Sequence, residues 1–229
     1  MPFGIRICSA CLREAAPAKA GISIFEFRIY QKMRIISGTS KGRRLVTPRG
    51  QALRPTSDRV KESIFNILGE EVEGKVVLDL FAGTGSLGIE ALSRGAKKVL
   101  FVEKGRQAIR LIERNLFQCG LKAQSEILPK DVNRAIGILD QRGESFDLIL
   151  MDPPYVKGLI QKTLLKLQSH RIHRDDSILV IEHDRREPLP KTIEGWNLIR
   201  ERAIGDTVIS FLTPRLSTDR QVQAGIDQV

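Results

Sequence analysis

The sequence predicts an α/β fold with a mostly parallel sheet, helices on both faces and an antiparallel final strand. Apolar runs of strand length alternate with helical patterns between residues 76 and 182, which is typical of strand–helix–strand units. Two further strands follow at 197–203 and 207–212, and Gly205-Asp206 between them favours a hairpin turn. A glycine-containing turn after the first apolar run places a ligand site at the carboxyl edge of the sheet.

The composition indicates one main domain with appendages. Of the 229 residues, 41% are hydrophobic, which is enough for one sizeable core. The formal net charge of +10 favours a polyanionic partner. Residues 33–62 hold eight Lys or Arg against Asp58 and Glu62, so that six of the ten net charges lie there. No run of roughly eighteen apolar residues occurs, and we therefore expect no membrane span.

The three cysteines provide no disulfide framework, which favours a reducing compartment and a cytoplasmic location. Cys8 and Cys11 have the spacing of zinc ligands, but no second pair follows and the histidines lie far along the chain. We therefore expect no metal site.

Residues 1–32 lack sustained periodicity, and a segment of different character begins at Met33. We interpret 1–32 as an extension that is disordered or lies upstream of the true start. A targeting peptide is the alternative, but the stretch carries Glu14 and Glu26 and has no compact apolar core. Residues 214–229 are polar and are expected to form a flexible tail.

Residues 33–70 are predicted to form a basic hairpin and a helix. Between 34 and 48 the pattern indicates two short strands around a glycine-containing turn. Thr56 or Ser57 can cap a helix over Asp58–Leu68. One face of that helix carries its apolar residues, which are Val60, Ile64, Ile67 and Leu68. A solvated basic turn is the alternative for the hairpin, but the concentrated charge favours nucleic-acid contact.

The stretch from residue 76 to residue 88 combines a buried strand, a tight turn and a helix start. The run 76–80 is short and apolar, as expected for a strand covered on both faces. Gly83 and Gly85 let the backbone turn sharply and approach a ligand closely. The helix starts at Ser86 and packs back on the sheet.

The next strand, 98–103, also ends on an acid. Glu103 is placed to accept hydrogen bonds from ribose hydroxyls, which predicts a nucleoside-containing cofactor. The spacing Gly83-x-Gly85-x-x-Gly88 fits the dinucleotide fingerprint as well, so a nicotinamide-dependent oxidoreductase is an alternative.

Further helices and strands complete the predicted sheet. A helix over 106–119 is expected to turn four residues inward, namely Ile109, Ile112, Leu116 and Phe117. Strands follow at 125–128, 146–151 and 178–182, with a helix at 159–167 before the last of these. Asp131 either lies over the cofactor base or caps the helix after it, and the sequence leaves both open.

The strand at 146–151 runs directly into Asp152-Pro153-Pro154-Tyr155, where the prolines fix an extended backbone. An exocyclic base amine is a poor nucleophile because its lone pair is delocalised into the ring. The Asp152 carboxylate and the Pro153 carbonyl can accept its two N–H groups and aim the lone pair at an electrophilic methyl group. Tyr155 offers a face for an unstacked base. A structural Pro-rich turn is the alternative, which explains the prolines but not the flanking Asp and Tyr.

Three stretches together resemble the bacterial RsmD family. They are Asp79–Gly85, Asp152–Tyr155 and Arg54–Asn66, and the opening Arg34-Ile-Ile-Ser-Gly supports them. The resemblance runs from about Met33 to Leu212, while residues 1–32 depart from the family pattern. It implies a Rossmann-like class I S-adenosylmethionine-dependent methyltransferase with a seven-stranded sheet, which methylates guanine N2 in 16S ribosomal RNA. The family's target nucleotide is guanine 966.

The resemblance also implies roles for particular residues. Those expected to bind S-adenosylmethionine are Asp79, Leu80, Phe81, Ala82, Gly83, Gly85, Glu103, Lys104 and Asp131. Those expected to hold the guanine are Asp152, Pro153, Pro154 and Tyr155. Those expected to contact RNA are Arg34, Lys41, Arg43, Arg44, Arg54 and Arg59.

The implied organisation is an RNA-binding part at 33–70 and a catalytic domain at 71–213. The implied partner is 16S rRNA or an assembly particle of the small ribosomal subunit, and we expect a monomer. Methylation of another RNA or DNA base amine stays open. A non-catalytic RNA-binding protein of the same fold is a further alternative, against which the intact Asp79 and Asp152 argue.

Overall fold

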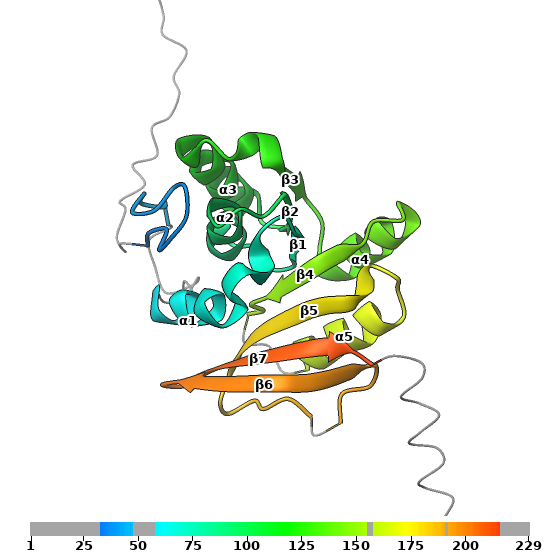
Figure 1. Cartoon of the computed structure of the whole chain (residues 1–229). Coiled ribbons are helices and arrows are strands. Elements are labelled where there is room, and N and C mark those ends of the chain that lie inside the picture. The colour runs from blue at the N-terminus through cyan, green and yellow to red at the C-terminus, as the bar shows by residue number, and fades with distance from the viewer. Residues whose placement is uncertain (1–32, 48–57, 155–157, 191, 216–229) are drawn as a thin grey trace, which may run out of the picture.

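The computed structural model describes residues 33–47, 58–154, 158–190 and 192–215. Its centre is a seven-stranded sheet in the order β3-β2-β1-β4-β5-β7-β6, with helices on both faces (Figure 1). The capping prediction for Thr56 and Ser57 and the predictions for residues 1–32 lie outside the described residues.

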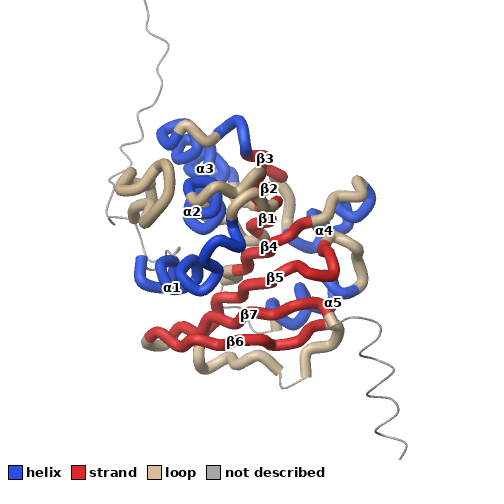
Figure 2. Tube along the Cα trace, in the orientation of Figure 1, coloured by secondary structure: helices blue, strands red, loops and turns tan. Residues whose placement is uncertain are grey.

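Five parallel strands form most of the sheet (Figure 2), and all five were predicted. They are β1 Val76–Asp79, β2 Lys98–Val102, β3 Ser125–Leu128, β4 Phe146–Met151 and β5 His173–Asp184. The strand β5 begins earlier than predicted because His173 pairs with Phe146 across a register shift, which extends the strand through polar residues.

The hairpin at the end of the chain is confirmed. It consists of β6 Trp196–Ile204 and β7 Thr207–Pro214. The strand β7 lies between β5 and β6 and runs antiparallel to both, so it is the one reversed strand of this sheet in the described part of the chain.

In the described ranges, five α-helices cover the two faces of the sheet. They are α1 Asp58–Leu68, α2 Ser86–Ser93, α3 Arg106–Cys119, α4 Val132–Gln141 and α5 Leu159–Gln168. Successive strand residues point to opposite faces, so Val77 packs with α1, α2 and α3, while Leu78 packs with α4 and α5. None of the helices in the described ranges is both long and apolar enough to cross a membrane.

The inward face of α3 differs from the prediction at Phe117 and at Ile109, which is half-buried and not among the buried residues of the helix. Phe117, expected in the core, is 77% exposed. The buried positions follow the helical period instead, and they are Ala108, Leu111, Ile112, Asn115, Leu116 and Cys119. Phe117 follows Leu116 by about 100° of rotation and so lies outside that face. Asn115 takes an inward position on this helix although it is polar.

Segment 33–47 forms a compact loop rather than the predicted pair of strands. Arg34 and Arg44 make a single antiparallel bridge, and the Leu45 N–H donates to the Met33 carbonyl at 2.9 Å. The Ile35 N–H donates to the Arg43 carbonyl at 3.0 Å and the Gly42 N–H to the Ile35 carbonyl at 2.8 Å, while the Ile36 and Ser37 N–H groups donate to the Glu90 side chain of α2. The loop, blue in Figure 1, therefore lies against α2 and α3.

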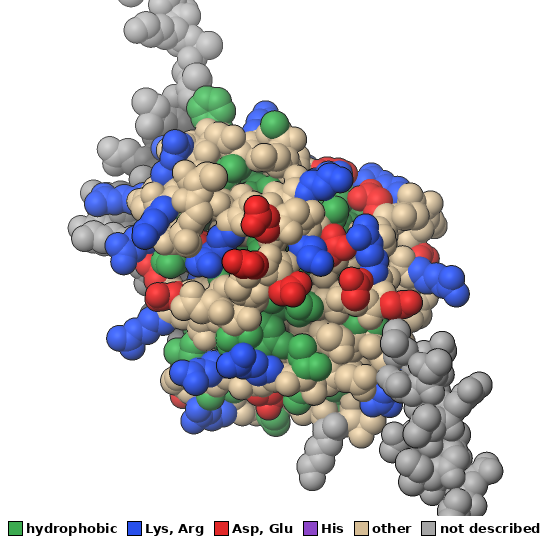
Figure 3. Space-filling model, viewed as in Figure 1, with side chains coloured by type: hydrophobic (Ala, Val, Ile, Leu, Met, Phe, Trp, Pro, Cys, Tyr) green, Lys and Arg blue, Asp and Glu red, His purple; other side chains and the backbone are tan. Residues whose placement is uncertain are grey.

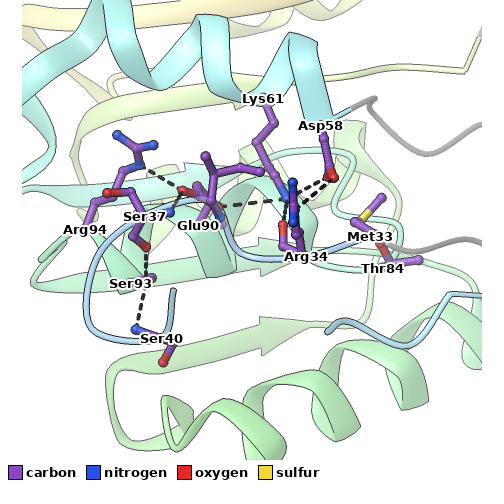
Figure 4. Close-up of polar contacts among 12 residues, drawn as sticks. Met33, Arg34, Ser37, Ser40, Asp58, Lys61, Thr84, Glu90, Ser93 and Arg94 are labelled. Atoms are coloured by element: carbon purple, nitrogen blue, oxygen red, sulfur yellow. Dashed lines mark hydrogen bonds and ion pairs between the residues drawn. The ribbon is translucent and has the colours of Figure 1, made fainter. Parts of the chain in front are cut away.

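The Glu90 carboxylate, which is fully buried, binds groups from three segments (Figure 4). It accepts hydrogen bonds from the N–H groups of Ile36 and Ser37 at 2.8 and 3.0 Å, and from Arg94 Nε at 2.9 Å. Lys61 Nζ of α1 lies 3.8 Å from its Oε2. These contacts compensate the buried charge and join α1, α2 and segment 33–47.

Lys61 is a fully buried cation in the same cluster. Burial lowers the pKa of its ammonium group, and the charges of Glu90 and Asp58 oppose that shift. The ammonium group also donates to the Arg34 carbonyl at 2.5 Å. Lys61 therefore belongs to the interior and adds nothing to the exposed basic surface that the sequence suggested for residues 33–62.

The change Glu90→Gln tests this cluster. It leaves Lys61 and Arg94 without their shared anion, and we expect the free energy of unfolding to fall by about 3–5 kcal/mol. The measurement is urea unfolding followed by circular dichroism. Glu71→Gln is the matched control, because Glu71 is exposed and lies 4.0 Å from Lys75, and it should change stability by less than about 1 kcal/mol. Equal midpoints for the two variants would contradict the account.

Candidate active site

Four acidic residues follow or end four neighbouring parallel strands. Asp79 ends β1, Glu103 follows β2, Asp131 follows β3, and Asp152 follows β4. Because these strands are neighbours in the order β3-β2-β1-β4, the acids come together along the carboxyl edge of the sheet. This is the edge at which open α/β sheets bind ligands.

The glycine loop between β1 and α2 is tied to both neighbouring strands. The Leu80 N–H donates to the Leu150 carbonyl at 3.0 Å, and the Ala82 N–H donates to the Val102 carbonyl at 3.1 Å. Gly83 and Gly85 have φ values of +54° and +80°, in the left-handed region that glycine adopts without strain.

The side chains of the loop residues differ in exposure. Leu80 is fully buried and belongs to the core on the side of α4 and α5, whereas Phe81 is half-buried and packs against that core. Ala82 is buried. The third glycine of the fingerprint, Gly88, allows close packing of α2 on β2, since a Cβ there would lie 2.3 Å from a Phe101 ring carbon.

The Glu103 carboxylate is fixed by two backbone donors. The Gly83 N–H donates to Oε2 at 2.9 Å, and the Gly105 N–H donates to Oε1 at 2.7 Å. Each carboxylate oxygen has a further lone pair for a ligand hydroxyl. Glu103 is half-buried beside the glycine loop, whereas Lys104 is exposed.

Asp79 is almost completely buried, with 1% exposed, and accepts a hydrogen bond from the Gly88 N–H at 3.1 Å. The pKa of its carboxyl is raised to about 7, chiefly by burial; the Gly88 hydrogen bond opposes the shift, and the charges of Asp152 and Glu103 contribute to it. The three carboxylates thus share one electrostatic environment. Such a site stabilises a positively charged ligand, since the ligand would relieve their mutual repulsion.

Asp131 caps helix α4. Its Oδ1 accepts a hydrogen bond from the Arg134 N–H at 3.2 Å, and its Oδ2 lies 3.5 Å from Arg134 Nε. Of the two predicted roles, capping is confirmed. Contact with a cofactor base stays a prediction that is compatible with the cap, because the side chain remains half-buried at the site edge.

The turn after β4 presents side chains of different exposure. Asp152 is half-buried, Pro153 is buried and Pro154 is exposed. Tyr155 lies outside the described residues.

The basic residues predicted to contact RNA are only partly free to do so. Arg34 lies 3.7 Å from Asp58, and the Arg43 guanidinium donates to the Gln118 carbonyl. Lys41, Arg44 and Arg59 are exposed. Arg54 lies outside the described residues. Figure 3 shows Lys and Arg side chains gathered on the side of the molecule where segment 33–47 lies.

Segment 33–47 lies along α2 and against the C-terminal part of α3. Its bend contacts the last turns of these helices, where Thr39 N–H donates to Ser93 O at 2.8 Å and Ser40 Oγ donates to Cys119 O at 3.2 Å. Both helices begin at the carboxyl edge and end at the opposite edge of the sheet. The exposed basic bend therefore lies away from the row of acids.

Asn115 is a site residue that the sequence analysis missed. Its Nδ2 donates to the carbonyls of Thr84 and Val46 at 3.0 and 3.1 Å, and its Oδ1 accepts the Val46 N–H at 2.7 Å. One buried amide thus connects the glycine loop to segment 33–47. A polar residue at an inward position between Ile112 and Leu116 was the available signal.

The change Asp79→Asn tests the electrostatics of the site. A folded-state pKa above the unfolded value means that the wild type loses stability as pH rises from about 4 to about 7. Asn retains an acceptor for the Gly88 N–H and does not titrate. We therefore expect the variant to gain about 2–3 kcal/mol in unfolding free energy relative to the wild type between pH 5 and pH 8. A difference that is constant across this range, measured by urea unfolding, would refute the raised pKa.

A family model matches most of the chain. The family, described as "Conserved hypothetical protein 95", matches residues 33–213. Two relatives, each described as ribosomal RNA small subunit methyltransferase D, cover most of the same region. The Escherichia coli K12 protein is 34% identical over 174 residues, which are 76% of this chain and 86% of the relative. The Haemophilus influenzae protein is 36% identical over 182 residues, or 79% of this chain and 92% of the relative.

Solved structures agree with the fold. The Escherichia coli protein yhhF is 29% identical, with a TM-score of 0.70 over 82% of this chain and 100% of its own. A conserved hypothetical protein of Streptococcus pyogenes is 34% identical, with a TM-score of 0.63 over 68% of this chain and 96% of its own. The chain therefore belongs to the RsmD family, the family of the ribosomal RNA small subunit methyltransferases D.

Proposed function

We propose that the protein transfers a methyl group from S-adenosylmethionine to the N2 amine of a guanine in 16S rRNA, acting as a monomer in the cytoplasm. The observation that carries this proposal is the Asp152-Pro153 turn beside the glycine loop. It follows β4, which pairs with β1 in a register that matches Asp79 with Leu150. The turn that can accept hydrogen bonds from an amine and the loop that can bind a cation thus follow neighbouring strands.

The site fits S-adenosylmethionine. This cofactor supplies an electrophilic methyl group on a positively charged sulfur, and it carries an α-ammonium group as well. Asp79 and Glu103 supply negative charge at the glycine loop, and the water-poor surroundings of Asp79 strengthen attraction to a cation. Gly83 and Gly85 leave the backbone of the loop open to a close ligand. Glu103 would accept hydrogen bonds from the ribose hydroxyls, and Asp131 would lie near the base.

Asp152 prepares the guanine amine for attack. Its carboxylate and the Pro153 carbonyl accept the two N–H groups, which bends the nitrogen toward tetrahedral geometry and exposes its lone pair. The methylated ammonium product loses its proton readily, so the reaction does not need a strong base at this position. Pro153 and Pro154 keep the turn extended, since neither residue can continue a helix. Tyr155 would support the face of the base.

Two further observations support an rRNA substrate. Relatives at 34% and 36% identity are described as ribosomal RNA small subunit methyltransferases. The exposed side chains of Lys41, Arg44 and Arg59 add positive charge for phosphate contacts. The substrate would be the naked RNA or an assembly particle of the small subunit.

The change Asp152→Ala tests the role of the turn. Loss of a charged acceptor in a water-poor site should cost about 3–4 kcal/mol of transition-state stabilisation, or roughly a hundred- to a thousandfold in rate. The measurement is single-turnover methylation of unmodified 16S rRNA with tritiated S-adenosylmethionine. Asp152→Asn retains one acceptor oxygen but also presents an amide donor to the amine, and it should also be slow.

Asp175→Ala provides the matched control, because Asp175 is an exposed carboxylate near the start of β5, far from the carboxyl edge. It should methylate at the wild-type rate. All variants should still bind S-adenosylhomocysteine, as measured by calorimetry. A near-normal rate for Asp152→Ala would remove Asp152 from the mechanism and leave the turn as a scaffold.

A further inference from the structure

The most exposed large hydrophobic residue in the described part of the chain is Phe117, at 77%. Three others follow it at 56%, 48% and 47%, and these are Ile199, Leu165 and Leu198. Phe117 lies in the last turn of α3, where its neighbours Leu116 and Cys119 are the residues buried in the core. The packing of the helix therefore does not explain an aromatic ring at this position.

Three arginines share the outer face of α3 with Phe117. Arg106, Arg110 and Arg114 precede it by eleven, seven and three residues, which places all four within about 80° around the helix axis. All three arginines are exposed. Glu113 is the one exposed acid among residues 106–119. The result is a basic ridge, Arg106–Arg110–Arg114–Phe117, roughly 20 Å long.

The basic ridge connects the candidate active site with the bend of segment 33–47. Its first residue follows Gly105, whose N–H binds the Glu103 carboxylate. At its other end the Arg43 guanidinium donates to the Gln118 carbonyl, directly after Phe117. The exposed Lys41 and Lys122 flank the same end. Positive charge thus continues from the carboxyl edge to the basic bend.

The chemistry of the basic ridge fits RNA better than protein. Nucleic-acid interfaces are much more positively charged than protein–protein interfaces, and here three guanidinium groups accompany the single aromatic ring with Glu113 as the one acid of the helix. Arginines spaced along a helix can neutralise successive phosphates, and an exposed aromatic ring stacks an unpaired base of any sequence.

We propose that this ridge is an RNA-contact surface, on which Arg110 and Arg114 bind phosphates and Phe117 stacks an unpaired base. The inference rests on the proposed function, because it takes RNA as the substrate. RNA bound along this ridge would extend from the basic bend of segment 33–47 to the carboxyl edge of the sheet, where the candidate active site lies.

Equilibrium binding of in vitro transcribed 16S rRNA, measured by filter retention over a range of KCl concentrations, tests the surface. Replacing Arg110 and Arg114 together with Gln should lower the slope of log affinity against log salt by about 1.4, the value for two single-strand phosphates. Phe117→Ala should lower affinity about 5- to 100-fold with the slope unchanged, since stacking releases no counterions. Phe117→Tyr retains the ring and should bind like the wild type.

Matched controls come from α5, on the opposite face of the sheet. Lys162→Gln removes an exposed cation, and Leu165→Ala removes an apolar side chain that is 48% exposed. Neither should change the affinity or the slope. Calorimetry with S-adenosylhomocysteine should give the wild-type affinity for every variant, which shows that the cofactor site is intact.

Two results would overturn the inference. The first is that Phe117→Ala binds naked RNA as tightly as Leu165→Ala does. The second is that Phe117→Ala loses affinity for small-subunit particles but not for naked RNA, which would indicate a protein partner. The binding measurement is independent of methyl transfer. If the α3 variants weaken binding while Asp152→Ala methylates normally, the ridge stands and the proposed chemistry fails. If the α3 variants bind RNA normally while Asp152→Ala methylates slowly, the proposed chemistry stands and the ridge is not an RNA-contact surface.

Discussion

The buried carboxylate of Glu90 is the interaction on which the arrangement of the molecule depends. Glu90 lies on α2, the helix that begins at the glycine loop, and it binds segment 33–47 and Arg94 while lying close to Lys61 of α1. An ionised carboxylate without partners would be very costly at a fully buried position. In its loop conformation, segment 33–47 supplies two backbone donors to this carboxylate.

The candidate active site uses charge in the opposite way. Around Glu90, cations and N–H groups surround the buried carboxylate, whereas at the carboxyl edge burial and the charges of Asp152 and Glu103 raise the pKa of Asp79. The free protein therefore holds Asp79 in an unfavourable state, which a cationic ligand would relieve. Local destabilisation of this kind is common at binding sites that are built for a charged ligand. Asn115 links the two regions, because its amide binds both the glycine loop and segment 33–47.

Much of the fold was predictable because apolar runs and helical periods are local properties. The parallel strands, the final hairpin and the helix Asp58–Leu68 were predicted near their observed bounds. The two strands expected for segment 33–47 reduce to one antiparallel bridge and a few backbone hydrogen bonds, and the Ile36 N–H binds Glu90, a partner more than fifty residues away that local patterns do not reveal. Phe117 was placed inward on hydrophobicity alone, although it follows Leu116 by about 100° around the helix and lies outside its buried face. Family membership rules out the nicotinamide-dependent alternative, which the glycine spacing alone had left open.

The most direct test of the central claim is to locate the transferred methyl group. Purified protein, S-adenosylmethionine and unmethylated 16S rRNA would be incubated, and the RNA digested and analysed by tandem mass spectrometry. The account predicts one N2-methylguanine at a single position, formed by the wild type and strongly reduced with Asp152→Ala. A methyl group on a ring nitrogen, on a ribose oxygen or on another base would contradict the assignment of the Asp152-Pro153 turn as the site that holds the guanine amine.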